Sequence, residues 1–107
     1  MSEWLAVARL DELPDRKPQA VELDGTPVAI VKVGDEVFAI EDVCSHAEVP
    51  LSEGEVDDQC TIECWLHASR FDLRTGEPQE PPAWEPVPVF ATRVVETDGV
   101  AVVEVEI

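Results

Sequence analysis

Basic residues are scarce in this chain of 107 residues. Seven lysines and arginines stand against 24 aspartates and glutamates, so the formal net charge is −17. Such a charge repels nucleic acid and anionic membranes, and we expect neither as a partner. It also steers a protein toward partners with basic docking surfaces, although acidity that only aids solubility is the alternative.

Long apolar runs are missing as well. No stretch approaches the ~20 apolar residues of a membrane span, and the longest low-charge segment, Val28 to Val33, is interrupted by Lys32. The first residues, Met1 to Trp4, show no basic segment followed by an apolar run, so no signal peptide is expected. Three cysteines cannot all pair, and an unpaired thiol fits a reducing cytoplasm. We therefore expect a cytoplasmic protein without a membrane anchor, in which Cys60 is a small buried apolar residue in a strand.

The chain also lacks a sustained apolar period of 3.6 residues, internal repeats and a linker that could separate domains. Segments rich in β-branched residues dominate instead, which predicts one all-β domain over residues 1–107. Two hairpins are expected, with turns at Gly34-Asp35 and Asp98-Gly99. The predicted strands are Trp4 to Leu10, Ala20 to Leu23, Thr26 to Val33, Glu36 to Ile40, Thr61 to Cys64, Phe71 to Leu73, Val87 to Thr97 and Val100 to Ile107.

In the last of these strands, apolar and acidic residues alternate. Val103, Val105 and Ile107 should face one side, and Glu104 and Glu106 the other. Loops are expected from Asp15 to Pro18 and from Glu77 to Pro88, and the second loop is rich in proline.

The two histidines of the chain each lie close behind a cysteine. A first arm reads Cys44-Ser45-His46, and a second arm, after 17 intervening residues, reads Cys64-Trp65-Leu66-His67. Each arm thus pairs one thiolate with one imidazole, which suits a two-iron cluster whose cysteines hold one iron and whose histidines hold the other. A zinc site can also use two cysteines and two histidines, but zinc fingers usually place both cysteines in one arm and both histidines in the other. The residues therefore predict one [2Fe–2S] cluster bound by Cys44, His46, Cys64 and His67.

This pattern resembles the signature of the Rieske [2Fe–2S] family. The stretch from Ala68 to Gly76 is also similar to the segment that follows the second histidine in small bacterial Rieske ferredoxins, although Ala68 stands where the family commonly has glycine. The resemblance implies a three-sheet antiparallel β sandwich with a small cluster-binding subdomain, approximately residues 43–84, made of two ligand loops. Rieske subunits of cytochrome bc complexes carry an extra cysteine in each ligand loop, joined as a disulfide, and a membrane anchor. This chain has neither, so it looks closer to the soluble ferredoxins that supply oxygenases.

The resemblance also points to four residues around the cluster. Ser69 matches a serine that hydrogen-bonds a cluster sulfide in high-potential members, unless it only caps a turn. Phe71 stands where those members use a tyrosine hydroxyl, and this chain has no tyrosine. Trp65 is expected in an exposed rim that a partner touches, or in a packing role. Trp84, in the proline-rich loop, is expected in a rigid lid beside the cluster, or as an ordinary core aromatic.

These features predict a soluble one-electron carrier and not an enzyme with a catalytic site of its own. Oxygen activation by non-haem iron needs a further site of two histidines and one carboxylate, and no histidine is left for it. We expect a monomer that passes electrons from a flavin-dependent reductase to a terminal non-haem iron oxygenase. The alternatives are the small subunit of a nitrite reductase and a redox partner of an iron–sulfur assembly system.

Overall fold

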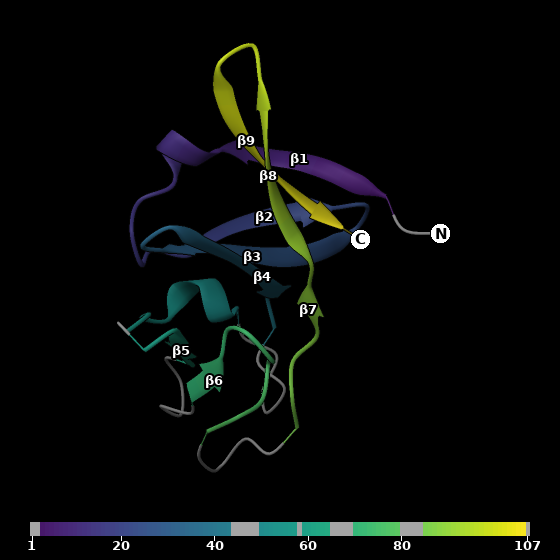
Figure 1. Cartoon of the computed structure of the whole chain (residues 1–107). Coiled ribbons are helices and arrows are strands. Elements are labelled where there is room, and N and C mark those ends of the chain that lie inside the picture. Colours follow the sequence, from purple (N-terminus) through teal and green to yellow (C-terminus); the bar gives the residue numbers. More distant parts are fainter. Residues whose placement is uncertain (1–2, 44–49, 58, 65–69, 80–84, 107) are drawn as a thin grey trace.

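The computed structural model describes residues 3–43, 50–57, 59–64, 70–79 and 85–106, and these form three antiparallel sheets (Figure 1). The first sheet has the order β1-β9-β8, the second β2-β3-β4-β7, and the third is the hairpin β5-β6. Two short 3₁₀ turns, η1 (Leu10–Glu12) and η2 (Leu51–Glu53), are the described helical elements, and neither is long and apolar enough to cross a membrane. The strands are β1 (Trp4–Arg9), β2 (Gln19–Leu23), β3 (Thr26–Val33), β4 (Glu36–Glu41), β5 (Thr61–Glu63), β6 (Arg70–Asp72), β7 (Val89–Phe90), β8 (Thr92–Thr97) and β9 (Val100–Glu106).

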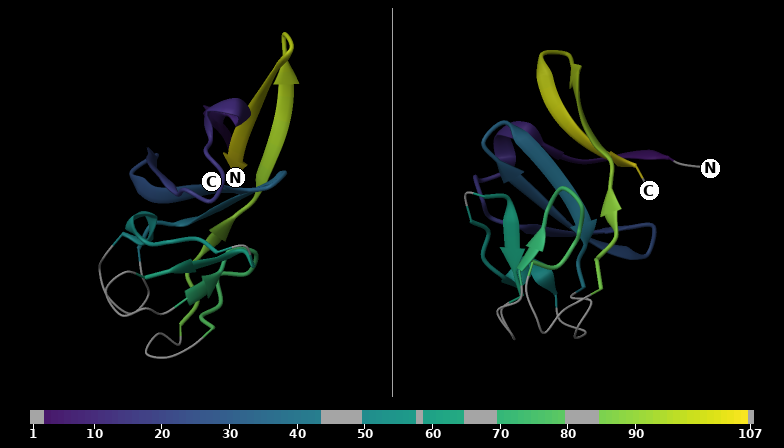
Figure 2. Two further views of the ribbon diagram at one scale, coloured as in Figure 1. Left: turned by 90° about the vertical axis from the view of Figure 1, so that its left-hand side faces the viewer. Right: turned by 60° about the horizontal axis from the view of Figure 1, so that its bottom comes forward.

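The sheets lie in three layers, with the four-stranded sheet in the middle (Figures 1 and 2). Strand β3 is buried on both faces, which explains its almost continuous apolar sequence. On one face Val28 and Ile30 belong to an apolar cluster with residues of β9. On the other face Ala29 and Val31 belong to a second cluster, with residues of the β5–β6 hairpin. The middle sheet therefore contributes to two cores.

The expected all-β architecture and most of the strands are confirmed. Strand β3 has the predicted bounds, and both predicted turns, Gly34-Asp35 and Asp98-Gly99, join antiparallel neighbours. In β9, Val103 and Val105 are fully buried while Glu104 and Glu106 are partly exposed. Ile107, predicted to share the buried face, lies outside the described residues.

Two expectations are wrong in detail. The strand predicted from Val87 to Thr97 is interrupted at Ala91, because β7 pairs with β4 in the middle sheet whereas β8 pairs with β9 in the first sheet. Cys60 is buried as expected, but it lies in the turn before β5 and not in a strand. Its φ of 63° is in the left-handed region, which is incompatible with extended strand backbone.

Candidate metal centre

Two of the predicted site residues lie in the described parts of the chain. Cys64 directly follows β5, Phe71 is the central residue of β6, and both are fully buried. They belong to the same apolar cluster, together with Ile62 and Leu73. The structure thus brings Cys64 and Phe71 into one core. The other predicted residues lie outside the described residues: Cys44, His46, Trp65, His67, Ser69 and Trp84.

The second arm lies in the connection of the β5–β6 hairpin. Ile62 pairs with Phe71 and Glu63 pairs with Arg70, so this last pair closes the hairpin immediately before Cys64. The amide of Leu73 donates to the carbonyl of Cys60 at 2.8 Å and extends the pairing at the other end. The backbone of Cys64 is therefore held by a short antiparallel ladder.

A carboxylate shapes the turn that enters β5. Asp57 accepts hydrogen bonds from the Thr61 amide at 3.0 Å, the Thr61 hydroxyl at 2.6 Å and the Gln59 amide at 3.0 Å. Arg70 Nη1 lies 3.8 Å from Asp57 Oδ2. Desolvation alone raises the pKa of Asp57, but the hydrogen bonds from Thr61 and Gln59 and the charge of Arg70 outweigh it, so this pKa lies below its usual value.

The turn η2 is packed directly on β5 through Gly54. The Gly54 amide donates to the Leu51 carbonyl at 2.9 Å, and the Glu63 amide donates to the Glu55 carbonyl at 2.8 Å. A Cβ at Gly54 would collide with the carbonyl group of Glu63. A residue with a side chain would separate η2 from β5, so glycine is required by this close approach.

The base of the first arm is closed by Asp42, which follows β4, and Ser52 in η2. Asp42 Oδ1 accepts a hydrogen bond from the Ser52 amide at 2.6 Å, and Oδ2 accepts one from the Ser52 hydroxyl at 2.7 Å. The Asp42 amide donates to the Pro27 carbonyl at 2.9 Å. The segment between Asp42 and Ser52 includes Cys44 and His46. The two residues that flank this segment are thus hydrogen-bonded to each other.

Both described ends of the proline-rich loop are hydrogen-bonded or paired with neighbouring segments. Pro78 forms an isolated bridge with Phe71, and the Val87 amide donates to the Gly76 carbonyl at 2.9 Å. Gly76 has a φ of 79°, and a Cβ there would collide with the carbonyl of Val87. The amide of Glu41 donates to the Pro88 carbonyl at 2.9 Å, which joins this loop to β4. The described ends of the loop therefore contact both the hairpin and the middle sheet.

The donor set of the two arms fits an iron–sulfur cluster. Cys60 and Cys64 are free thiols, so no disulfide ties up Cys64. Thiolate and imidazole together suit iron in a mixed cysteine and histidine environment. Within the described residues no group of three or more His, Cys, Asp and Glu side chains could hold a metal ion, so the ligand set is an interpretation of the sequence pattern.

The sequence alone did not point to Asp42, Ser52, Asp57 and Gly54, because polar residues and glycine in loops give no signal of a tertiary contact.

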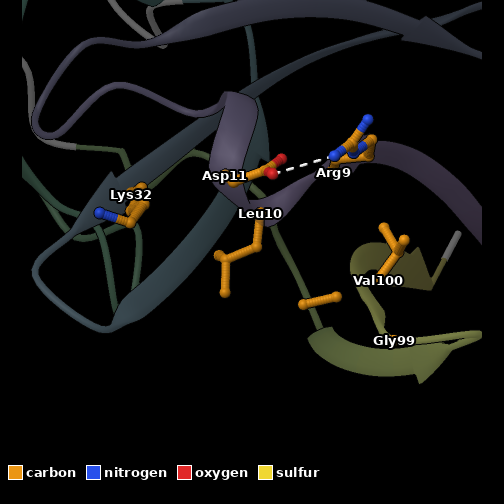
Figure 3. A pocket seen from close by; sticks show the side chains of 7 residues that line it. Arg9, Leu10, Asp11, Lys32, Gly99 and Val100 are labelled. Carbon is orange, nitrogen blue, oxygen red and sulfur yellow. Dashed lines mark hydrogen bonds and ion pairs between the residues drawn. The ribbon is translucent and has the colours of Figure 1, made fainter.

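A cavity of about 360 Å³ lies elsewhere in the molecule, between η1, the end of β3 and the β8–β9 turn (Figure 3). Arg9 and Asp11, which line it, form an ion pair at 3.0 Å, and Leu10 and Val100 contribute apolar surface. Of the predicted site residues, the structure describes Cys64 and Phe71, and neither of these two lines the cavity.

Comparison with known proteins agrees with the sequence pattern. A family model described as the Rieske [2Fe-2S] domain matches residues 3–91. The anthranilate 1,2-dioxygenase ferredoxin subunit of Burkholderia cepacia is 42% identical over 96 residues, which cover 90% of this chain and 88% of that protein.

Solved structures give the same result. The ferredoxin of carbazole 1,9a-dioxygenase from Nocardioides aromaticivorans IC177 is 40% identical, with a TM-score of 0.82 over 94% of this chain and 95% of that one. A ferredoxin chain with 35% identity and a TM-score of 0.82, covering 95% of this chain and 91% of that one, comes from a complex of reduced oxygenase and oxidised ferredoxin in carbazole 1,9a-dioxygenase. A nitrite reductase small subunit from Mycobacterium tuberculosis has a TM-score of 0.86, covering 100% of this chain and 96% of that one, but at 24% identity it shows a shared fold alone.

Proposed function

Because the chain belongs to the Rieske [2Fe–2S] family, we propose that it is a soluble one-electron carrier between a flavin-dependent reductase and a terminal non-haem iron oxygenase. The observation that carries the proposal is that both arms, each with one cysteine and one histidine, fall inside the matched residues 3–91. Like the ferredoxin subunits to which it is similar, the chain is an electron-transfer component and not the catalytic one.

We assign one [2Fe–2S] cluster per chain to Cys44, His46, Cys64 and His67. When bound, this group supplies a one-electron redox couple. The buried, unpaired thiol of Cys64 at the base of the second arm supports the assignment. A buried cysteine without a metal is also an ordinary core residue, so the paired spacing of the arms is the stronger support.

The residues behind Cys64 keep one side of the site dry. Ile62, Phe71 and Leu73 are almost completely buried and form an apolar wall with Cys64. The ring of Phe71 offers no hydroxyl that could donate a hydrogen bond, so this side chain contributes packing and not a polar contact. A dry, close-packed wall limits the rearrangement that a change of charge can cause nearby.

The charge around the arms supports docking to a basic surface. Residues 41–85 contain twelve aspartates and glutamates but two arginines, Arg70 and Arg74. A surface of this kind attracts a partner with basic residues and accelerates encounter at low ionic strength. We propose that the chain acts as a cytoplasmic monomer and presents this side to both the reductase and the oxygenase.

The two alternative functions have weaker support. The relatives with about 40% identity are ferredoxin subunits of dioxygenases, whereas the nitrite reductase small subunit shares the fold at 24% identity. None of the relatives named above is described as an iron–sulfur assembly protein. Supply of an oxygenase is therefore the function that fits best.

The proposal is tested on the purified full chain in two steps. Metal and sulfide analysis should give two irons and two labile sulfides per chain, whereas one zinc without sulfide would contradict the cofactor. The protein is then combined with the reductase and the oxygenase of an aromatic-ring dioxygenase, and substrate-dependent oxygen uptake is measured. Uptake should require the chain and should be abolished by Cys64→Ser. Uptake at the same rate without the chain would refute the role as carrier.

A further inference from the structure

Asp42 is the one charged residue that is buried among the described residues, with 6% of its surface exposed. An ionised carboxylate in such a position is unfavourable unless hydrogen bonds replace the lost water. Both of its oxygens have a partner in Ser52, at 2.6 Å to the amide and 2.7 Å to the hydroxyl. Hydrogen bonds to a charged acceptor are stronger than neutral ones. This contact therefore joins the end of β4 strongly to η2.

The link encloses the first arm. Asp42 directly follows the region where β4 is paired with β3, and its own amide is bonded to Pro27 in β3. Ser52 lies in η2, next to the fully buried Leu51. Both ends of the enclosed segment are therefore fixed to the core, and the segment contains Cys44 and His46.

The same link also relates the first arm to the second. Gly54, two residues after Ser52, is in close contact with the Glu63 carbonyl, and Glu63 directly precedes Cys64. A path of short contacts thus runs from Asp42 through η2 to the base of the second arm. A shift of Ser52 would change where one arm lies relative to the other.

We infer that Asp42 is a positioning residue for the metal centre, which fixes the first arm through its two hydrogen bonds to Ser52. The inference rests on the proposed function, since the arm is taken to carry two cluster ligands. Residues that support metal ligands typically affect metal retention by about 10–100-fold. Asp42 acts through the backbone of the arm, so we expect an effect near the lower limit of that range.

The test compares four variants of the purified full chain with the unmodified protein. Asp42→Ala removes both bonds, and Ser52→Ala removes the hydroxyl bond and keeps the amide bond. Asp42→Asn keeps an oxygen for the Ser52 amide and offers an amide group to the hydroxyl. Asp15→Ala is the control, because it removes a carboxylate hydrogen bond, from the Gly34 amide at 2.8 Å, at the β3–β4 turn, which lies at the opposite end of these strands from Asp42.

Two quantities are measured: the rate of iron loss to a chelator and the g-values of the reduced protein in electron paramagnetic resonance. We expect Asp42→Ala to lose iron about tenfold faster with altered g-values, Ser52→Ala to fall in between, and Asp42→Asn to remain close to the unmodified protein. Asp15→Ala should lower the melting temperature and leave both quantities unchanged.

The outcomes separate this inference from the proposed function. Equal iron loss and equal g-values in Asp42→Ala and the unmodified protein would overturn the positioning role and leave the carrier role intact. Equal effects of Asp15→Ala and Asp42→Ala would reduce Asp42 to a general contribution to stability, which also overturns the inference. If Asp42→Ala does not fold, Ser52→Ala is compared with Asp15→Ala by the same criteria. An unmodified protein without iron and sulfide would instead refute the proposed function itself.

Discussion

A methyl group at Gly54 should disrupt the contact between η2 and β5. Gly54 has a φ of −87°, which alanine adopts without strain, so the substitution tests the contact alone. The added Cβ would collide with the Glu63 carbonyl and lie 3.2 Å from the Leu51 carbonyl oxygen. Both neighbours are backbone atoms, which cannot rotate away as a flexible side chain can.

The expected cost of Gly54→Ala follows from this geometry. Overpacking in a well-packed region costs about 1–3 kcal/mol, and a collision with backbone belongs at the upper end of that range. For a domain of about 100 residues, each kcal/mol lowers the melting temperature by roughly 4 °C, so we expect a decrease of roughly 10 °C. Because β5 leads to Cys64, the variant should also retain less iron than the unmodified protein.

Thermal unfolding followed by circular dichroism measures the effect, and Gly99→Ala is the control. Gly99 has a φ of 79°, but a Cβ there meets nothing within 4 Å, so this variant carries backbone strain without a collision. It should be destabilised by about 1 kcal/mol with an unchanged iron content. If Gly54→Ala melts within 1 or 2 °C of the unmodified protein, the close packing of η2 on β5 is refuted.

Three further predictions concern the thiols, the charge and the carboxylate of Asp57. Cys64→Ser should prevent stable cluster assembly while Cys60→Ser should leave the visible spectrum intact, and bleaching by Cys60→Ser would mean that the ligands are misassigned. Electron transfer to an oxygenase should slow as salt rises, because charges beyond about 8 Å are screened at physiological ionic strength, and a flat or rising stopped-flow rate would leave acidity as a solubility feature. Asp57 has a lowered pKa in the folded state, so its ionised form stabilises the fold above the usual value of 3.8, and this contribution is lost as the pH falls through the lowered pKa. Urea unfolding should therefore separate Asp57→Asn from the unmodified protein at pH 7 and bring the two together in acid, and an equal separation at both pH values would contradict the shift.

The strands were predictable where a local pattern coincides with burial. The β-branched run of β3 and the alternation in β9 identify strands because each pattern is imposed by the faces on which the side chains pack. The interruption at Ala91 was not predictable, since apolar residues continue across it while the chain passes from one sheet to another. Local preference carries no information about which sheet a strand joins.

The candidate site likewise has residues that the sequence reveals and contacts that it does not. The cysteines and histidines are found from the sequence because rare residue types recur at short spacing. The bond between Asp42 and Ser52 is not, because aspartate and serine are common loop residues and ten positions separate them. The contact of Gly54 with Glu63 is likewise a result of tertiary packing, which a single sequence does not reveal.

Strand β3 connects these observations physically. Its Ala29 and Val31 pack in the core that holds Cys64, and its Val28 and Ile30 pack in the core shared with β9. Arg93, which lies 4.2 Å from the ring of Trp4 and 2.6 Å from Glu104, stabilises the first sheet beyond that second core. Loss of this contact affects the site only through the middle sheet, whereas loss of the Asp42 contact acts on the first arm directly. A substitution at Arg93 should therefore lower overall stability with little effect on the metal centre, whereas a substitution at Asp42 should alter the metal centre directly.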